Sequence, residues 1–329
     1  MLIDSFGRQI TYLRVSVTDR CNFRCVYCMP PGGIEHLAHD NILRYEEIFE
    51  IVQAAAEQGV REVRLTGGEP LVRKDLPVLV GMLSQIPGIE EVSLTTNGLL
   101  LEKYAESLAE AGLKRVNISL DTLDNERFAR ITRGGSLETA WRGIEAAERY
   151  GLTPIKINVV LMRGINDDEV ADLAKITLKH PWHIRFIELM PLQNQAAWGE
   201  DFPDPREAYF GVDEAIEKLA GLGLEPINEK SGNGPAVEYR LRDGKGRIGF
   251  ISPLSEGHFC KRCNRLRLTA DGYLRPCLMS DQEIPVLAAL RNGEAILPLL
   301  QQAVEMKPLG HSLASNQRPT GRYMTQIGG

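Results

Sequence analysis

A strand-like segment followed by a helix-like segment repeats six times between Tyr12 and about Glu188. The predicted strands are rich in β-branched residues, and they span 12–18, 62–66, 91–95, 115–119, 154–160 and 183–188. Strand and helix alternating at this spacing predict right-handed crossovers and a parallel sheet. Six units are too few to close the eight-stranded α/β barrel, so we predict an open, partial (βα)6 barrel that resembles part of a TIM barrel. Its functional loops should follow the carboxyl ends of the strands.

Two of the intervening helices carry capping signals. Apolar residues recur at helical spacing from Ile48 to Ala56, and Gly59 follows at a position typical of helix C-termini. Ser136 is a predicted N-cap in front of an apolar face that begins at Leu137, and Gly151 follows that helix.

The pattern changes after Met190. Residues 191–205 are rich in Pro, Gln, Asn and Asp and predict a connecting loop, and a short helix is predicted over 212–220. Two antiparallel hairpins are then predicted, one pairing 236–242 with 247–252 and the other pairing 264–269 with 273–277. Pro298 interrupts an otherwise helical stretch over 294–306. We therefore divide the chain into a partial barrel, residues 1–190, and a C-terminal antiparallel β/α region, residues 191–329, which is expected to cover the open side.

Composition excludes several classes of protein. The chain has 329 residues, of which 43% are hydrophobic and 25% charged, so it can bury a large core and is neither fibrous nor disordered. Its net charge of −6 argues against attraction of the whole surface to nucleic acid or to an anionic membrane. No apolar run approaches the length of a membrane span, and residues 1–10 lack the apolar region of a signal peptide. We expect a cytoplasmic protein that binds neither nucleic acid nor membrane.

Six cysteines fall into two groups of three. The first group is Cys21, Cys25 and Cys28, directly after the first predicted strand, and the second group is Cys260, Cys263 and Cys277. Clustered cysteines in a cytosolic chain bind metal or do redox chemistry more often than they form disulfides. Three closely spaced thiolates can hold three irons of a cubane cluster and leave the fourth iron open, as a reactive metal centre requires. The alternative for each group is a structural zinc ion, with His36 or His39 completing the first site and His258 the second.

The first 190 or so residues resemble the radical S-adenosylmethionine (SAM) superfamily. The resemblance lies in the C-x3-C-x-aromatic-C pattern, with Tyr27 before Cys28, and in Thr66-Gly67-Gly68-Glu69-Pro70. It implies that SAM chelates the open iron and that one electron from the cluster breaks SAM into methionine and a 5′-deoxyadenosyl radical. The Gly67-Gly68 backbone and Glu69 are expected to receive the SAM ammonium group. The resemblance implies SAM contacts at Tyr27, Gly68, Ser119 and Met190.

Basic residues surround the second group. They are Lys261, Arg262, Arg265, Arg267 and Arg275. Arg265 and Arg267 stand two apart on a predicted strand, so both guanidinium groups point to the same face. Planar and permanently charged groups at this spacing suit a polyphosphate.

Over essentially its full length the chain resembles the GTP 3′,8-cyclase family, the radical SAM enzymes that open molybdenum cofactor biosynthesis. The matching segments are 13–16, 18–25, 64–70, 95–98, 185–190, 263–267 and the terminal Gly328-Gly329. The resemblance implies a second [4Fe-4S] cluster on the second group, with an open iron that binds the guanine of GTP. It also implies GTP contacts at Arg14, Arg64, Thr95, Lys156, Arg265, Leu266 and Arg267.

The implied reaction begins when the adenosyl radical takes the ribose 3′ hydrogen of GTP, and the substrate radical then closes on C8 of guanine. Catalytic roles are predicted for Arg14, Arg265 and Arg267, and Arg14 is the candidate that assists reduction of the closed aminyl radical. The two terminal glycines are expected to reach the active site, although Met324-Thr325 departs from the usual Met-Ser of the family. The family also implies a homodimer, a flavodoxin or ferredoxin electron donor, and a cyclic pyranopterin monophosphate synthase that receives the product.

Two other functions stay open at this point. Radical SAM enzymes that modify peptides also carry additional C-terminal cysteines, typically in a longer and more cysteine-rich extension. A zinc-stabilised protein that binds nucleotides without chemistry would hold two zinc ions and no iron. The cyclase interpretation requires that both cysteine groups face one enclosed chamber.

Overall fold

The computed structural model describes residues 1–192, 198–229, 232–311, 313 and 319–328. Six parallel strands lie side by side in chain order, each within two residues of the predicted segment at either end. Their bounds are β1 Tyr12–Ser16, β2 Glu62–Thr66, β3 Glu91–Thr96, β4 Arg115–Ser119, β5 Lys156–Leu161 and β6 His183–Glu188. The predicted open, partial barrel is confirmed.

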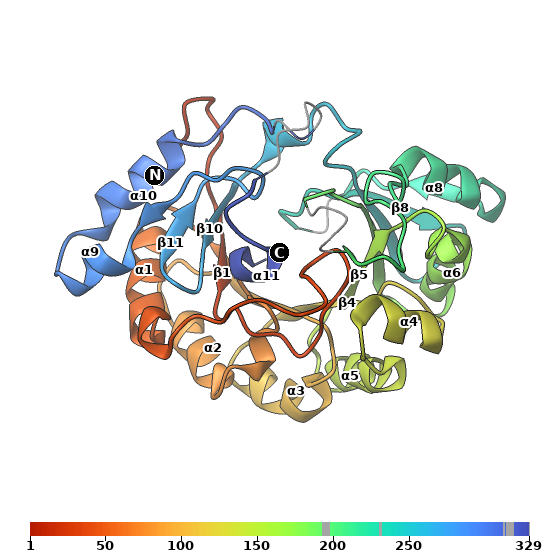
Figure 1. The fold of residues 1–329 in the computed structure, drawn as a ribbon, viewed down its shortest axis with the longest axis horizontal. Coiled ribbons are helices and arrows are strands. Elements are labelled where there is room, and N and C mark those ends of the chain that lie inside the picture. The colour runs from red at the N-terminus through yellow and green to blue at the C-terminus, as the bar shows by residue number, and fades with distance from the viewer. Residues whose placement is uncertain (193–197, 230–231, 312, 314–318, 329) are drawn as a thin grey trace.

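Helices cover the outer side of this curved sheet (Figure 1). They are α1 Tyr45–Glu57, α2 Leu76–Ser84, α3 Leu101–Glu110, α4 Asn125–Thr132, α5 Leu137–Arg149 and α6 Val170–Lys179. Both capping predictions are confirmed. The Ser136 hydroxyl accepts a hydrogen bond from the Thr139 amide at 3.3 Å, and Gly59 follows α1 with a φ of +99°.

The two faces of the sheet differ in chemistry because side chains alternate along each strand. Leu13 and Val15 of β1, like Val63 and Leu65 of β2, are fully buried in the core beneath the helices. Arg14, between the first two, points to the inner side. The core therefore lies between sheet and helices, and the inner side is left for polar residues.

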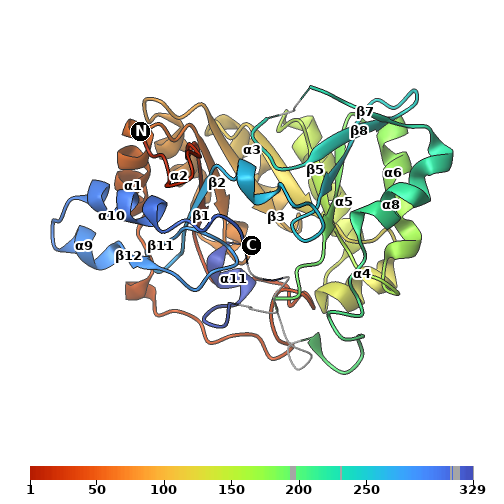
Figure 2. The same cartoon turned by 90° about the horizontal axis from the view of Figure 1, so that it is seen from above.

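The C-terminal strands extend the same sheet at both edges. They are β7 Leu224–Pro226, β8 Val237–Leu241, β9 Arg247–Ile251, β10 Arg265–Leu268, β11 Tyr273–Arg275 and β12 Ile284–Pro285. The two predicted hairpins are present, β8 with β9 and β10 with β11, and both are antiparallel. However, β9 pairs with β6 and β10 pairs with β1 in parallel register, which the hairpin pattern does not reveal. The result is one mixed sheet of 12 strands, wrapped around the open side (Figures 1 and 2). The division of the chain at residue 190 stays a prediction.

The remaining helices are α8 Val212–Leu219, α9 Leu287–Arg291, α10 Ile296–Glu305 and α11 Met324–Ile327. Pro298 does not interrupt a helix, because it lies in the first turn of α10, where backbone amides have no intrahelical partner. Part of the predicted 191–205 loop, residues 193–197, lies outside the described residues.

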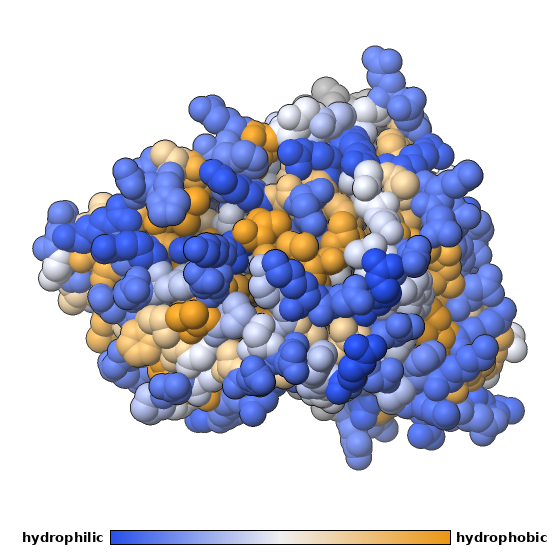
Figure 3. Space-filling view, turned by 90° about the horizontal axis from the view of Figure 1, so that it is seen from below, coloured by the Kyte–Doolittle hydropathy of each residue, from blue (hydrophilic) through white to orange (hydrophobic). Residues whose placement is uncertain are grey.

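None of the described helices has the length and apolar character that a membrane crossing demands. On the face in Figure 3, hydrophilic side chains surround a small central group of hydrophobic ones.

Candidate active site

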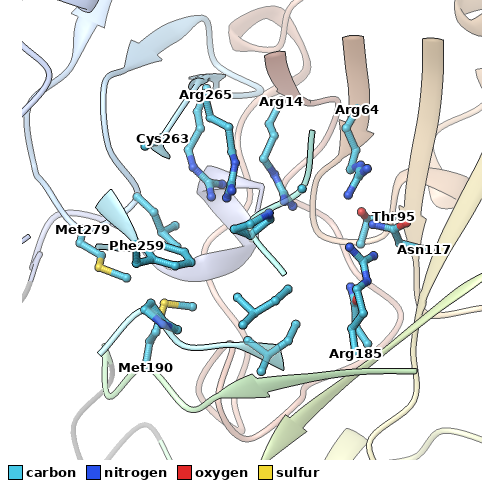
Figure 4. A pocket seen from close by; sticks show the side chains of 18 of the residues that line it. Arg14, Arg64, Thr95, Asn117, Arg185, Met190, Phe259, Cys263, Arg265 and Met279 are labelled. Atoms are coloured by element: carbon cyan, nitrogen blue, oxygen red, sulfur yellow. The ribbon is translucent and has the colours of Figure 1, made fainter. Parts of the chain in front are cut away.

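A cavity of about 270 Å³ lies on the inner side of the sheet. Its lining comes from all six barrel strands, from β9 and β10, and from the loops that carry the second cysteine group. Figure 4 shows Arg14, Arg64 and Arg265 pointing into a common space, with Arg185 directed toward it from the opposite side. The cavity is therefore enclosed by the inner face of the barrel sheet and by the C-terminal strands and loops that extend it at each edge.

A row of arginines crosses one wall of this cavity. Arg14 of β1 pairs in register with Arg267 of β10 on one side and with Arg64 of β2 on the other. The row continues through Ser93 of β3 to Arg115 of β4. Because paired positions on neighbouring strands face the same side, these guanidinium groups gather in one layer. We call these four arginines, together with Arg265 and Arg185, the arginine wall.

Burial and repulsion between like charges lower the pKa values of several arginines of the wall. Burial, and then Arg267, hold the pKa of Arg14 well below its ordinary value. Burial, with Arg265, lowers the pKa of Arg267 to about 10. A cluster of like charges in a poorly hydrated site is relieved when an anion binds, so the wall is suited to a polyanion.

Arg185 is a wall residue that the sequence reasoning did not assign, although it stands in a segment that resembles the cyclase family. It is 5% exposed, and burial, with Arg64 and Arg115, lowers its pKa to about 9. Its Nε and Nη2 atoms have no hydrogen-bond partner among the described residues. The alternation of His183, Arg185 and Ile187 along β6 is the signal that places it on the inner face.

Other predicted GTP contacts divide into two sets. Thr95 lines the cavity, and its buried hydroxyl oxygen has no hydrogen-bond partner in the described part of the chain. Lys156 does not line the cavity but pairs in register with Asn117, which does. Burial, and then Arg185, Arg115 and Arg64, lower the pKa of Lys156 to about 7. Leu266 packs in the hydrophobic core on the other face of β10, so contact with a ligand there would pass through its backbone.

The second cysteine group opens onto the cavity. Cys260, Cys263 and Cys277 all contribute to its lining, beside Arg265 and Arg267. Burial opposes ionisation of the Cys263 thiol, yet Lys307 and Arg265 together hold its pKa below the ordinary value. Cys263 thus lies in a cationic environment that favours the thiolate form that metal binding requires, whereas burial raises the pKa of Cys260.

The loop of the first cysteine group is positioned by backbone contacts with the glycine-rich loop after β2. The Gly68 amide donates to the Thr18 carbonyl, and the Glu69 amide donates to the Arg20 carbonyl, both at 2.8 Å. A Cβ on Gly68 would lie 2.3 Å from the Arg20 carbonyl oxygen. Only glycine allows this approach, so the motif sets the position of the cysteine loop.

Glu69 is held by hydrogen bonds within the protein, and its expected contact with the SAM ammonium stays a prediction. Its carboxylate accepts hydrogen bonds from the Leu71 amide at 3.0 Å, from the Thr96 hydroxyl at 2.7 Å and from the Asn97 amide at 2.7 Å. It is almost fully buried, and burial raises its pKa to about 7. Glu69 therefore ties the loop after β2 to the end of β3.

Three of the four predicted SAM contacts line the same cavity. They are Tyr27, Ser119 and Met190, whereas Gly68 does not. The Tyr27 hydroxyl donates to Asp121 at 2.7 Å, and Asp121 also accepts from the Val160 amide at 2.8 Å. The first-group cysteines are not among the lining residues, and Tyr27 is the residue through which their loop reaches the cavity. The second group therefore faces the cavity as expected, and that the first group faces the same chamber stays a prediction.

The C-terminal tail connects the two cysteine groups. Arg267 donates to the Gly328 carbonyl at 2.9 Å, and the Thr325 backbone donates to the Cys28 thiol. Gly328 has a φ of +68°, and a Cβ there would lie 2.3 Å from the Thr66 hydroxyl oxygen. The tail thus enters the interior with glycine where only glycine fits, and Gly329 lies outside the described residues.

Both cysteine groups have the donors that a cubane cluster needs. All six cysteines are described and none forms a disulfide, and the thiols within each group lie close enough to influence one another's ionisation. Among the described residues, no three His, Cys, Asp or Glu side chains are arranged to hold a metal ion. A cubane places each thiolate on a separate iron and needs no such convergence, so the donor set fits a cluster of this kind.

Comparison with known proteins defines the class first. Residues 15–176 match the family model described as the radical SAM superfamily, and residues 182–313 match the one described as Molybdenum Cofactor Synthesis C. In a solved structure of SuiB from Streptococcus suis bound to S-adenosylmethionine, the same fold recurs, with a TM-score of 0.60. That match has 13% sequence identity and covers 92% of this chain and 76% of SuiB, so it concerns the fold alone.

Two relatives then narrow the class. The chain is 52% identical over 331 residues to the GTP 3′,8-cyclase of Pelotomaculum thermopropionicum and 51% identical over 330 residues to that of Moorella thermoacetica. Each match covers 99% of both chains. The chain belongs to the GTP 3′,8-cyclase family.

Proposed function

We propose that this chain carries out the reaction of its family, the conversion of GTP to (8S)-3′,8-cyclo-7,8-dihydroguanosine 5′-triphosphate, the first step of molybdenum cofactor biosynthesis. The observation that carries the proposal is a single cavity lined by the second-group thiols, by the arginine wall and by Tyr27, Ser119 and Met190. A cubane site, a polyanion site and a SAM site thus share one enclosure, as a lyase that acts on a nucleoside triphosphate requires.

Two [4Fe-4S] clusters and SAM are the cofactors. Cys21, Cys25 and Cys28 would hold the first cluster and Cys260, Cys263 and Cys277 the second, with SAM against Tyr27, Gly68, Ser119 and Met190. When bound, the reduced first cluster and SAM supply the 5′-deoxyadenosyl radical that takes the ribose 3′ hydrogen.

The protein's own residues position the substrate and exclude water. Arg14, Arg64, Arg265 and Arg267 would bind the triphosphate, with charge-assisted hydrogen bonds of about 1.5–3 kcal/mol each. We add Arg185 to this set, because its buried guanidinium retains donors without partners among the described residues. Two anchors, guanine at the second group and phosphates at the wall, would hold C3′ in the path of the radical.

Arg14 is assigned a further part, assistance in reducing the closed aminyl radical. It stands centrally in the wall, between Arg267 and Arg64. Arg14→Ala should still cleave SAM but yield far less cyclic product. An Arg14→Ala enzyme that converts GTP at the normal yield would remove this role.

Family membership supports the remaining proposals. They are a reduced flavodoxin or ferredoxin as electron donor, a cyclic pyranopterin monophosphate synthase as recipient of the product, a homodimeric state and a cytoplasmic location. None of the described helices could serve as a membrane span, in agreement with the last.

The decisive experiment is anaerobic iron and sulfide analysis followed by a SAM cleavage assay. We expect about eight irons per chain, from two clusters, and formation of 5′-deoxyadenosine that GTP stimulates. A colourless protein that holds zinc would support a nucleotide-binding protein instead. SAM cleavage stimulated by peptides and indifferent to GTP would support a peptide-modifying enzyme.

A further inference from the structure

A lysine behind the second cysteine group joins the segments that carry it. Lys307 follows α10, does not line the cavity and is 4% exposed. Its ammonium donates to the Arg265 carbonyl at 2.6 Å, to the Pro276 carbonyl at 2.8 Å and to the Cys263 Sγ at 3.6 Å. Arg265 lies two residues after Cys263, and Pro276 lies directly before Cys277. The Lys307 side chain thus joins the segment that carries Cys263 to the segment that carries Cys277.

The charge of Lys307 has no carboxylate beside it. Its three hydrogen-bond partners are two carbonyls and one thiol, and no ion pair within the described part of the chain includes it. Burying an ammonium group without a counter-ion destabilises the folded state by several kcal/mol. A negative charge close to Lys307 would offset this cost. Burial lowers the pKa of Lys307, and the thiolates of Cys263 and Cys277 are the groups that oppose this change most strongly.

The neighbouring anchor confirms that the segment is fixed against the cysteine loop. Arg8 donates to the Cys260 carbonyl at 2.8 Å, to the Leu309 carbonyl at 3.2 Å and to the Pro308 carbonyl at 2.6 Å. Arg8 differs from Lys307 in one respect, since Asp4 lies 2.5 Å away and neutralises it. Lys307 is therefore a buried cation that lies beside the cysteine group and has no ion-pair partner among the described residues.

We propose that Lys307 is the positioning residue of the second cluster: it fixes the spacing of Cys263 and Cys277, and its charge balances the anionic cluster that they hold. The inference rests on the proposed function, which places a cluster on this group. A cluster with three thiolates gains negative charge when it is reduced, and a nearby ammonium stabilises that state. Lys307 should therefore raise the midpoint potential of the second cluster.

The test uses the full-length chain with Cys21, Cys25 and Cys28 changed to Ser, so that the second group is the remaining cluster site. Lys307→Met removes charge and donors, and Lys307→Gln retains donors without charge. Lys261→Met is the matched control, because Lys261 lies between Cys260 and Cys263 in sequence but is exposed to solvent, which screens its charge. Iron content, the midpoint potential from a redox titration followed by electron paramagnetic resonance, and thermal melting are measured for each protein.

We call the chain with the three Cys→Ser changes the parent. We expect the parent and its Lys261→Met variant to hold about four irons per chain, and their second clusters to have the same midpoint potential. Lys307→Met should lose more than half of its iron, and Lys307→Gln should hold a cluster with a more negative potential. Where Lys307→Met fails to fold, as its melting curve will show, the Lys307→Gln potential decides. The proposal would be overturned if Lys307→Gln had the midpoint potential of the parent, whatever the iron content of either variant. That result would leave the proposed function intact. A parent without iron would instead overturn both.

Discussion

Burial raises the pKa values of all three thiols of the first group, whereas cationic side chains adjoin the thiols of the second group. Burial raises the pKa of the Cys21 thiol to about 11 and raises that of the Cys25 thiol well above its ordinary value. In the second group, burial acts against a nearby Lys307 and Arg265, and the pKa of Cys263 is lowered. Cys263 and the thiols of the first group thus lie in different electrostatic environments, although burial also raises the pKa of Cys260.

This difference agrees with two different tasks. The loop of the first group is fixed by close backbone approach and by Arg24 and Arg133, which donate to its carbonyls, so a reactive centre there would be held in place. The second group adjoins the arginine wall, where an anionic substrate has to be held. Three predictions, from the largest expected effect to the smallest, test whether the two environments serve these tasks.

Loss of one cysteine should separate the two groups most sharply. Cys25→Ser should abolish SAM cleavage, because the first cluster loses a ligand. Cys263→Ser should leave SAM cleavage measurable and abolish the cyclic product, because that group positions the substrate. Chromatography of 5′-deoxyadenosine and of the product, under anaerobic conditions, measures both. Equal loss of SAM cleavage in the two variants would contradict the idea that the first group serves SAM cleavage and the second group holds the substrate.

The backbone approach at the first group is tested by Gly68→Ala. The new Cβ would lie 2.3 Å from the Arg20 carbonyl oxygen, and a backbone atom can be displaced only by moving the cysteine loop. We expect the free energy of unfolding to fall by about 1–3 kcal/mol, as for other overpacked sites, and iron to be lost from the first group. Gly81→Ala is the control, because nothing lies within 4 Å of its Cβ position in α2. There the free energy of unfolding should rise by about 0.5–1 kcal/mol. Equal urea denaturation midpoints would contradict the steric account.

The smallest expected effect concerns Lys156, a buried cation near the arginine wall. Its pKa is lowered to about 7 by burial and by Arg185, so the ammonium is present below that pH and lost above it. The KM for GTP should therefore rise a few-fold from pH 6.5 to 8.5, and by no more than about tenfold per pH unit. Lys156→Arg keeps its charge at every pH in this range and should flatten the profile. An identical pH profile in Lys156→Arg would show that Lys156 does not act through its charge.

Local patterns in the sequence determined the six parallel strands, their order, the capped ends of α1 and α5, and both cysteine groups. These features depend on residues that are neighbours along the chain or repeat at a fixed period, so they can be read without coordinates. The spacing of Arg265 and Arg267 likewise placed both on one face of a strand.

Only the tertiary structure decided how distant segments meet. The parallel pairing of β10 with β1 and of β9 with β6 joins segments far apart in the chain, and neither strand's own pattern specifies its partner. That pairing brings Arg267 beside Arg14 and places Arg185 in the same cavity. Burial, which sets the charge on Lys156 and isolates Lys307 behind the second group, arises only when these surfaces close over one another.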